Sequence, residues 1–256
     1  GAQTSETGYL KEVVQIDAMG GTGRGEKNRF GTSLAVTESK EVYGWGNSLY
    51  GALGVKSSIV SKPVRVGTDI SNAVQVAGGG KSGSDDWHVN SIGNTGYTYI
   101  LKEDGTVSSL GYNVNGELGN GAKVSTTAVQ EVSNLTEIMQ VAGSKNGNFG
   151  AAVKEDGTVW TWGRNDGGQL GNNNTSNKSL PVQVKGGASG SEYLTDVVQV
   201  TAGNWHSMAL KANGTVYAWG WGQYGQLGNG YTTNSDDTDK YSGEKIYSAP
   251  VQVLSG

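Results

Sequence analysis

The sequence predicts an all-β protein in which four similar units each fold as a small antiparallel sheet. First, a set of short motifs recurs four times in the same order, at intervals of about 60 residues. Second, 43 of the 256 residues are glycine and only 3 are proline, with no Gly-X-Y period, which indicates many tight turns and excludes collagen. Third, apolar residues alternate with a period of two, and no segment sustains the 3.6-residue period of a helix.

Each unit opens with a strand around a Val-Gln or Met-Gln pair. In the fourth copy Val198-Gln199-Val200 alternates with period two, and Ala209-Leu210-Lys211 continues the pattern after a glycine-containing turn. These two runs predict the first and second strands of the unit. The pairs that open the four copies are Val14-Gln15, Val74-Gln75, Met139-Gln140 and Val198-Gln199.

The second and third strands are joined by Asp-Gly or Asn-Gly in three copies: Asp104-Gly105, Asp156-Gly157 and Asn213-Gly214. Such dipeptides favour a two-residue hairpin turn in which both central residues have positive φ. The first copy has Ser39-Lys40 instead, which predicts a turn of a different type.

The third strand follows as Thr-Val-x-x-Trp-Gly in the third and fourth copies. In every copy a Gly-x-Leu-Gly motif begins five residues after the glycine that ends this strand, with Gln as x in the third and fourth copies. The fourth strand is Pro-Val-Gln-Val. All prolines (Pro63, Pro181, Pro250) occupy this one repeat position, which Ala128 fills in the second copy. Four strands per unit, repeated radially, predict β-propeller blades. We expect a single module, residues 1–256, with repeats at approximately 10–70, 71–135, 136–194 and 195–256.

These motifs closely resemble the regulator of chromosome condensation repeat family, best through Gly203-Asn204-Trp205-His206-Ser207-Met208-Ala209-Leu210 and Gly168-Gln169-Leu170-Gly171. Departures include Leu110 in place of tryptophan and Ala128 in place of proline. The resemblance implies a β-propeller, commonly seven-bladed, that serves as a protein-binding platform. The founding member is an exchange factor for the small GTPase Ran, and bacterial members include secreted inhibitors of β-lactamase.

Four repeats leave two arrangements open: a closed four-unit ring, or part of a larger propeller. The chain begins and ends inside inter-repeat segments, so we expect either a piece cut at repeat boundaries from a longer chain or a four-unit ring. An open arc would expose apolar blade faces and could self-associate through them.

Residues for catalysis, cofactors or metals are not recognisable in the sequence. The chain has no cysteine and only two histidines, His88 and His206, which predicts no zinc site. Gly220-x-Gly222-x-x-Gly225 fits a dinucleotide fingerprint only literally, because no helix pattern follows it. We therefore expect a protein that is not an enzyme, with no catalytic residues, no cofactor and no metal.

Charge and hydropathy exclude two further classes of partner. The net charge is −4, with 16% charged residues, which argues against nucleic acid binding. No apolar run approaches the length of a membrane span, so no membrane insertion is expected.

The long loops are the predicted binding surface, because equivalent loops of a propeller gather on one face. We expect a protein or glycan partner there, with Trp87 as an aromatic anchor. The alternatives are an exchange-factor-like regulator of a small GTPase, a structural spacer or a glycan-binding module. The Asn/Thr/Gly-rich loops favour a bacterial surface or secreted protein, located extracellularly or at the cell surface. The predicted partner-binding residues are Arg24, Lys27, Arg29, Asp85, Asp86, Trp87, His88, Lys145, Asn146 and Trp205.

Overall fold

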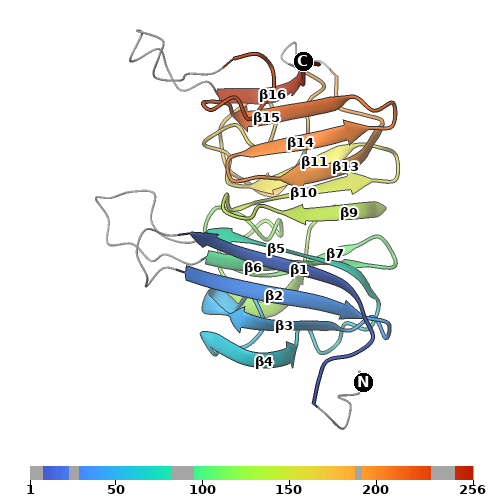
Figure 1. Ribbon diagram of the computed structural model, residues 1–256, viewed down its shortest axis with the longest axis vertical. Coiled ribbons are helices and arrows are strands. Elements are labelled where there is room, and N and C mark those ends of the chain that lie inside the picture. The colour runs from blue at the N-terminus through green and yellow to red at the C-terminus, as the bar shows by residue number, and fades with distance from the viewer. Residues whose placement is uncertain (1–7, 23–28, 82–94, 188–191, 232–245, 256) are drawn as a thin grey trace, which may run out of the picture.

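The computed structural model describes residues 8–22, 29–81, 95–187, 192–231 and 246–255, whose strands form four separate four-stranded antiparallel sheets (Figure 1). The predicted all-β propeller architecture is confirmed. Each sheet, called a blade here, is a meander in which consecutive strands are neighbours. A short 3-10 helix, η2 (Leu49–Gly51), follows the third strand of blade 1. Among the described residues, no helix has the length and apolar character needed to cross a membrane.

The strands of the blades have the following bounds. Blade 1 contains β1 (Val13–Thr22), β2 (Arg29–Thr37), β3 (Val42–Asn47) and β4 (Ile59–Arg65); blade 2 contains β5 (Ala73–Lys81), β6 (Thr95–Lys102), β7 (Val107–Gly111) and β8 (Thr126–Glu131). Blade 3 contains β9 (Ile138–Gly143), β10 (Phe149–Lys154), β11 (Val159–Gly163) and β12 (Lys178–Gln183); blade 4 contains β13 (Val197–Ala202), β14 (His206–Lys211), β15 (Val216–Trp221) and β16 (Ile246–Gln252).

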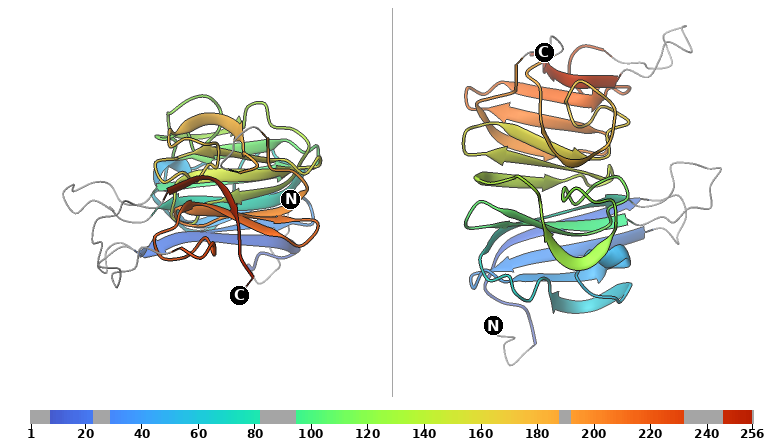
Figure 2. Two further views of the ribbon diagram at one scale, coloured as in Figure 1. Left: turned by 90° about the horizontal axis from the view of Figure 1, so that it is seen from above. Right: turned by 180° about the vertical axis from the view of Figure 1, so that it is seen from behind.

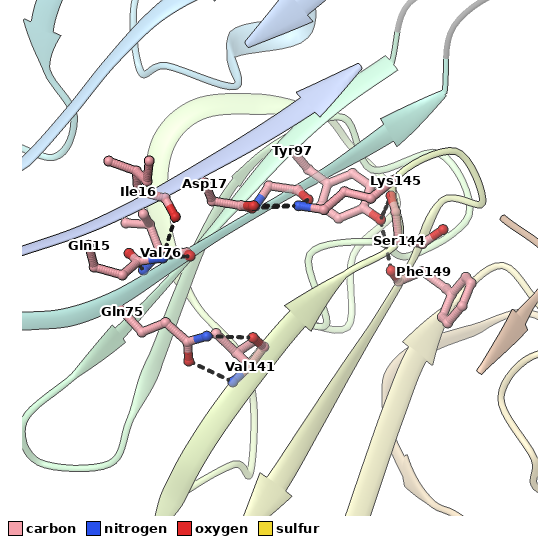
Figure 3. Close-up of polar contacts among 11 residues, drawn as sticks. Gln15, Ile16, Asp17, Gln75, Val76, Tyr97, Val141, Ser144, Lys145 and Phe149 are labelled. Atoms are coloured by element: carbon pink, nitrogen blue, oxygen red, sulfur yellow. Dashed lines mark hydrogen bonds and ion pairs between the residues drawn. The ribbon is translucent and has the colours of Figure 1, made fainter. Parts of the chain in front are cut away.

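The blades follow one another from the N-terminal to the C-terminal end of the molecule (Figure 2). The first strand of each blade contacts the first strand of the next, in the order β1, β5, β9 and β13. The glutamine of the opening motif explains this contact. Gln15 accepts a hydrogen bond from Val76 N (2.9 Å) and donates one to Val76 O (3.2 Å), and Gln75 does the same with Val141 (3.0 and 3.1 Å) (Figure 3). Gln140 in turn accepts from Val200 N at 2.8 Å.

The hydrophobic core lies between successive blades, in one cluster at each of the first two junctions and two clusters at the third. The repeat tryptophan closes the second and third junctions from the following blade. Trp162 donates its indole N–H to Glu117 O (2.8 Å), and Trp219 donates to Gln169 O (2.9 Å); both side chains are completely buried. Leu110 occupies this place in blade 2 and is also completely buried. The departure from tryptophan thus keeps an apolar contact and gives up one hydrogen bond.

The hairpin turns differ from the prediction at one residue. The glycines have positive φ, +72° at Gly105 and +77° at Gly157, but the aspartates before them do not. Asp104 instead accepts hydrogen bonds from Thr106 N (2.9 Å) and Thr106 Oγ1 (2.6 Å), which favours a three-residue loop with only the glycine left-handed. The predicted two-residue turn is therefore wrong.

The turn of blade 1 is of the same type as the others, so the prediction of a different type is also wrong. Lys40 takes the place of the glycine with φ of 59°. Its amide donates to Thr37 O at 2.8 Å, as Gly105 N donates to Lys102 O at 3.0 Å. Strand pairing on both sides of the turn imposes the left-handed conformation even on a residue with a Cβ.

Substituting alanine for Gly157 should lower the free energy of unfolding by about 2–3 kcal/mol, because positive φ is unfavourable and the new Cβ would meet the backbone of the next blade. A Cβ at Gly157 would lie 3.0 Å from Asp196 N. Gly214 in blade 4 has similar φ (+85°) and nothing within 4 Å of its Cβ position, so Gly214→Ala should cost only about 1 kcal/mol. Urea unfolding of both variants measures the difference, and equal losses would contradict the blade contact.

The four blades form an open arc. Val76, Val141 and Val200 each face the preceding blade and are 1% exposed, whereas Ile16, at the same position of blade 1, is 72% exposed. No strand of blade 4 therefore covers this face of blade 1 within the described part of the chain. Of the two arrangements left open by the sequence, the closed four-unit ring is wrong, and the blades have the arrangement of part of a larger propeller.

Candidate functional site

A pocket of about 620 Å³ lies at the boundary between blades 3 and 4. Loops that follow strands of both blades supply its walls: the β11–β12 loop of blade 3, and the β13–β14 loop and the segments around β15 and β16 of blade 4. Its lining residues are Asp166, Gly167, Asn204, Trp205, Trp221, Tyr224 and Ile246. Three aromatic side chains thus converge on one concave site, the usual composition of a recognition pocket.

Trp205 of blade 4 packs against Arg164 and Gly167 of blade 3. The guanidinium of Arg164 lies 4.1 Å from the centre of its ring, and Arg164 is itself fixed by an ion pair with Asp166 at 2.6 Å. Gly167 leaves room for the indole, because a Cβ there would lie 3.0 Å from Trp205 Cε3. The tryptophan is therefore oriented before any partner binds, which reduces the entropy lost on binding.

Trp221 packs edge-on against Trp205, with ring centres 5.5 Å apart, and its ring centre lies 6.4 Å from that of Tyr224. Its Nε1 is buried and has no hydrogen-bond partner among the described residues. A buried N–H donor that lacks a partner is unfavourable. An oxygen acceptor would reach this N–H only if the aromatic side chains around it moved, because the atom is shielded from solvent.

The loop after Trp221 differs from its equivalents in blades 2 and 3. Asn113 and Asn165 clamp those loops, accepting from Leu118 N and Leu170 N at 2.9 Å and donating to carbonyls across the loop. Gly222 stands at this position in blade 4. A glycine cannot supply the amide clamp, so the wall of the pocket is formed by aromatic packing in its place.

The polar groups at the pocket suit binding better than proton transfer. The carboxylate of Asp166 is engaged by Arg164. His206, at the start of β14, is half-buried with its ring against Gly203, and burial lowers its pKa from the ordinary value. Among the described residues no group of three or more His, Asp or Glu side chains gathers as metal ligands would.

The predicted partner-binding residues fall in different places. Trp205 lines the pocket from the β13–β14 loop. Ser144 of the neighbouring β9–β10 loop donates a hydrogen bond from its hydroxyl to Gly203 O at 2.6 Å, which joins the two loops. Lys145 in that neighbouring loop is bound internally: its Nζ lies 2.6 Å from Asp17 Oδ2 of blade 1 and 3.2 Å from Gly78 O (Figure 3). Lys145 is thus a contact between blades rather than a free cation for a partner.

Of the other predicted residues, Asn146 is the one whose side chain belongs to the described part of the chain. Asn146 is half-buried beside Lys145 and makes a contact of its own. Arg29 begins β2, where only its backbone is described. The positions Arg24, Lys27, Asp85, Asp86, Trp87 and His88 lie outside the described residues.

Sequence reasoning missed Trp221, Tyr224 and Asp166. The signal for Trp221 is present in the repeat, because it is an extra tryptophan two residues after the repeat tryptophan Trp219 and precedes Gly222 where asparagine stands in blades 2 and 3. No such signal marks Asp166. Its place at the pocket depends on the packing of two blades.

Comparison with known proteins gives consistent results. The Regulator of chromosome condensation (RCC1) repeat matches residues 40–82, 156–210 and 213–255, and a second description of this repeat matches residues 197–226. The chain is 32% identical over 203 residues to the human E3 ubiquitin-protein ligase HERC2 (78% of this chain, 4% of that protein). It is 30% identical over 238 residues to the ultraviolet-B receptor UVR8 of Arabidopsis thaliana (88% of this chain, 49% of that protein).

Solved structures share the fold. Human WBSCR16 superposes with a TM-score of 0.65 at 20% identity over 95% of this chain and 53% of its own. Yeast RCC1 (Prp20), solved bound to Kap60, superposes with a TM-score of 0.66 at 19% identity over 95% of this chain and 49% of its own. The chain thus spans about half the length of these structures and of UVR8, and 4% of HERC2.

Proposed function

Because the chain belongs to the regulator of chromosome condensation repeat family, we propose that it is a non-catalytic protein-binding module that engages a partner protein through the pocket between blades 3 and 4. The observation that carries the proposal is the convergence of Trp205, Trp221 and Tyr224 on one concave site. Tryptophan and tyrosine in a well-packed pocket are the residues that dominate binding energy in protein interfaces.

The chemistry of the pocket favours an apolar or aromatic side chain next to a hydrogen-bond acceptor. The aromatic faces and Ile246 would contact the side chain, and Trp221 Nε1 would donate to the acceptor once the surrounding aromatic rings move apart. Relatives support a protein partner, since yeast RCC1 was solved bound to Kap60 and a homologue is named X-linked retinitis pigmentosa GTPase regulator. The ligase activity of HERC2 supplies no argument for this chain, which covers 4% of that protein.

A glycan is the second candidate, because Asp166 and Asn204 place a carboxylate and an amide beside the aromatic faces. Polar groups of this kind fix the orientation of a ligand held by aromatic surfaces. An array of immobilised glycans, probed with the chain and with Trp205→Ala, distinguishes this candidate. Glycan binding that is lost in the variant, together with failure to select any peptide, would replace the protein partner by a glycan.

Substitution of Trp205 or Trp221 by alanine should weaken binding of peptides selected from a random display library by at least about tenfold, because each removes one wall of the pocket. The matched control is Tyr193→Ala, which removes an aromatic ring that pairs with a cation (Lys185 Nζ at 4.1 Å) away from the pocket. Isothermal titration of the selected peptides measures the change. Equal affinity for all variants would contradict the pocket as the binding site.

A further inference from the structure

The two ends of the arc carry the two halves of the interface that joins successive blades inside the chain. We propose that blade 4 of one copy docks onto blade 1 of a second copy, so that two chains associate head to tail. The repeat positions that carry this proposal do not include Trp205, Trp221 or Tyr224, although Tyr224 lies in the same β15–β16 loop as two of them. Its evidence is a set of repeat positions that are buried at the three internal junctions and uncovered at the ends.

The glutamine ladder is the first of these positions. In blades 1 to 3 the glutamine of the opening motif is half-buried and binds the backbone of the valine that follows the equivalent glutamine in the next blade. The pairs are Gln15 with Val76, Gln75 with Val141 and Gln140 with Val200. The fourth glutamine, Gln199 of blade 4, is exposed. Its equivalent partner is the backbone of Ile16, because Ile16 stands at the repeat position where Val76, Val141 and Val200 bind a glutamine. Ile16 is 72% exposed.

The second repeat position that is uncovered at an end of the arc is the residue after the first glycine of the Gly-x-Leu-Gly motif. The carbonyls of Ala52, Glu117 and Gln169 accept hydrogen bonds from the following blade at 2.7, 2.8 and 2.9 Å, and these residues are completely buried. Gln226 is the fourth and is only half-buried. It presents its carbonyl at the end of the arc, where no following blade is described.

Blade 1 holds the donors that match this carbonyl. In the following blades the donors are the hydroxyls of Thr98 and Ser207 and the indoles of Trp162 and Trp219, all completely buried. The equivalents in blade 1 are Ser33 and Trp45, which pair across β2 and β3 as Ser207 and Trp219 pair across β14 and β15. Both are only half-buried, because within the described residues no blade lies on this side of blade 1.

The outer rim shows the same pattern. Gly121 N donates to Ser179 O, and Asn173 N donates to Ser248 O, both at 2.8 Å, which joins each loop to the outer strand of the next blade. The equivalent donor in blade 4 is Gly230, and the equivalent acceptor in blade 1 is Ser61; both residues are exposed.

Apolar packing would accompany these hydrogen bonds. Leu34, Tyr99 and Ala151 face the following blade and are completely buried, whereas Met208, at their position in blade 4, is half-buried. Docking would bring Met208 against the face of Ile16. Burial of apolar surface together with matched backbone groups is what stabilises the three internal junctions, so it should also stabilise the fourth.

A second copy is the occupant that the structure supports, because the chain itself presents both halves in the required spacing. The arc covers 49–53% of the length of solved propellers of this fold, with TM-scores of 0.65–0.66, so two copies together have about the length of one such propeller. Head-to-tail contacts that close after one turn give a ring, and in this ring each copy would use both of its ends.

Sedimentation velocity of the 256-residue chain, from about 1 to about 100 μM, tests the association. The expected mass is twice the 26.6 kDa of one chain. Ile16→Glu should weaken association at least about 100-fold, because docking would bury an unpaired carboxylate. Val124→Glu is the matched control, since Val124 is also 72% exposed but lies in blade 2, away from the ends, and this variant should associate like the wild type.

Mixing two variants tests the direction of the contact. Gln199→Glu alone, like Ile16→Glu alone, should be monomeric, and the mixture should form a heterodimer through the remaining intact pair of faces. Circular dichroism of each variant checks the fold, which exposed substitutions should leave unchanged. A wild-type chain that stays monomeric at all concentrations would overturn the proposal. Dimers that survive both substitutions, or a mixture that does not associate, would do the same.

Discussion

Replacing Trp162 with alanine is expected to lower the free energy of unfolding by about 3–5 kcal/mol. The side chain is completely buried between blades 2 and 3, its ring centre lies 5.2 Å from that of Tyr99, and its indole N–H donates to Glu117 O at 2.8 Å. The substitution would leave a large cavity and deprive a buried carbonyl of a donor. Equilibrium unfolding in urea at fixed pH measures the loss.

Trp160→Ala is the matched control, because Trp160 lies two residues earlier in β11 and is only half-buried. Its Nε1 donates to Thr158 Oγ1 at 3.1 Å within the same blade. We expect a loss of about 1–2 kcal/mol, since part of the ring remains in contact with water. Trp160 also packs against the apolar cluster of this junction, so a Trp160→Ala loss as large as that of Trp162→Ala would show that complete burial does not decide the size of the loss.

Substituting glutamine for Glu117 is expected to remove a pH dependence of stability: relative to the wild type, the variant should gain up to about 3 kcal/mol between pH 4 and pH 8. Burial raises the pKa of Glu117 from its ordinary value of 4.5 to about 7. Hydrogen bonds to the carboxylate from Asn115 N and Asn115 Nδ2, both at 2.8 Å, offset only part of this shift.

The direction of the pH dependence follows from proton binding. Between pH 4.5 and about pH 7 the folded chain keeps a proton on Glu117 that the unfolded chain has released. Raising the pH through this interval therefore favours the unfolded state, and the loss is complete above the folded pKa. Glutamine does not titrate, so the variant lacks this loss.

The repeat supports the substitution sterically, because glutamine occupies this position in blades 3 and 4. Gln169 Oε1 accepts from Gly167 N and Gln226 Oε1 accepts from Tyr224 N, both at 2.8 Å, as Glu117 Oε2 accepts from Asn115 N. Thermal unfolding from pH 4 to pH 8 compares the variant with the wild type and with Glu155→Gln, which removes one negative charge from an exposed turn. Parallel pH profiles for all three proteins would contradict the role of burial.

Several features of the fold were predictable from the sequence because local interactions determine them. Period-two runs and glycine at the turns fix strands and hairpins within one blade, and the opening Val-Gln pairs mark where each blade begins. The exact turn was less predictable. The side chain of Asp104 binds Thr106, and strand pairing holds Lys40 left-handed, so residue preferences alone gave the wrong turn in both cases.

The candidate site was predicted only through Trp205, because a pocket between blades depends on which loops meet. Lys145 illustrates the difficulty. It was predicted to bind a partner, yet it pairs with Asp17, which lies 128 residues away in sequence. Trp221 carried a weak signal as an extra tryptophan, and Asp166 carried none.

The sequence by itself therefore determined the blade, its four-fold repetition and the family, because each of these depends on contacts within about 60 residues. Only the tertiary structure decided that the four blades form an open arc, that Ile16 and Gln199 are left exposed at opposite ends, and that the aromatic pocket lies between blades 3 and 4. The physical reason is that burial of a repeat position depends on the neighbouring blade, and the same motif is core at one junction and surface at the end of the arc.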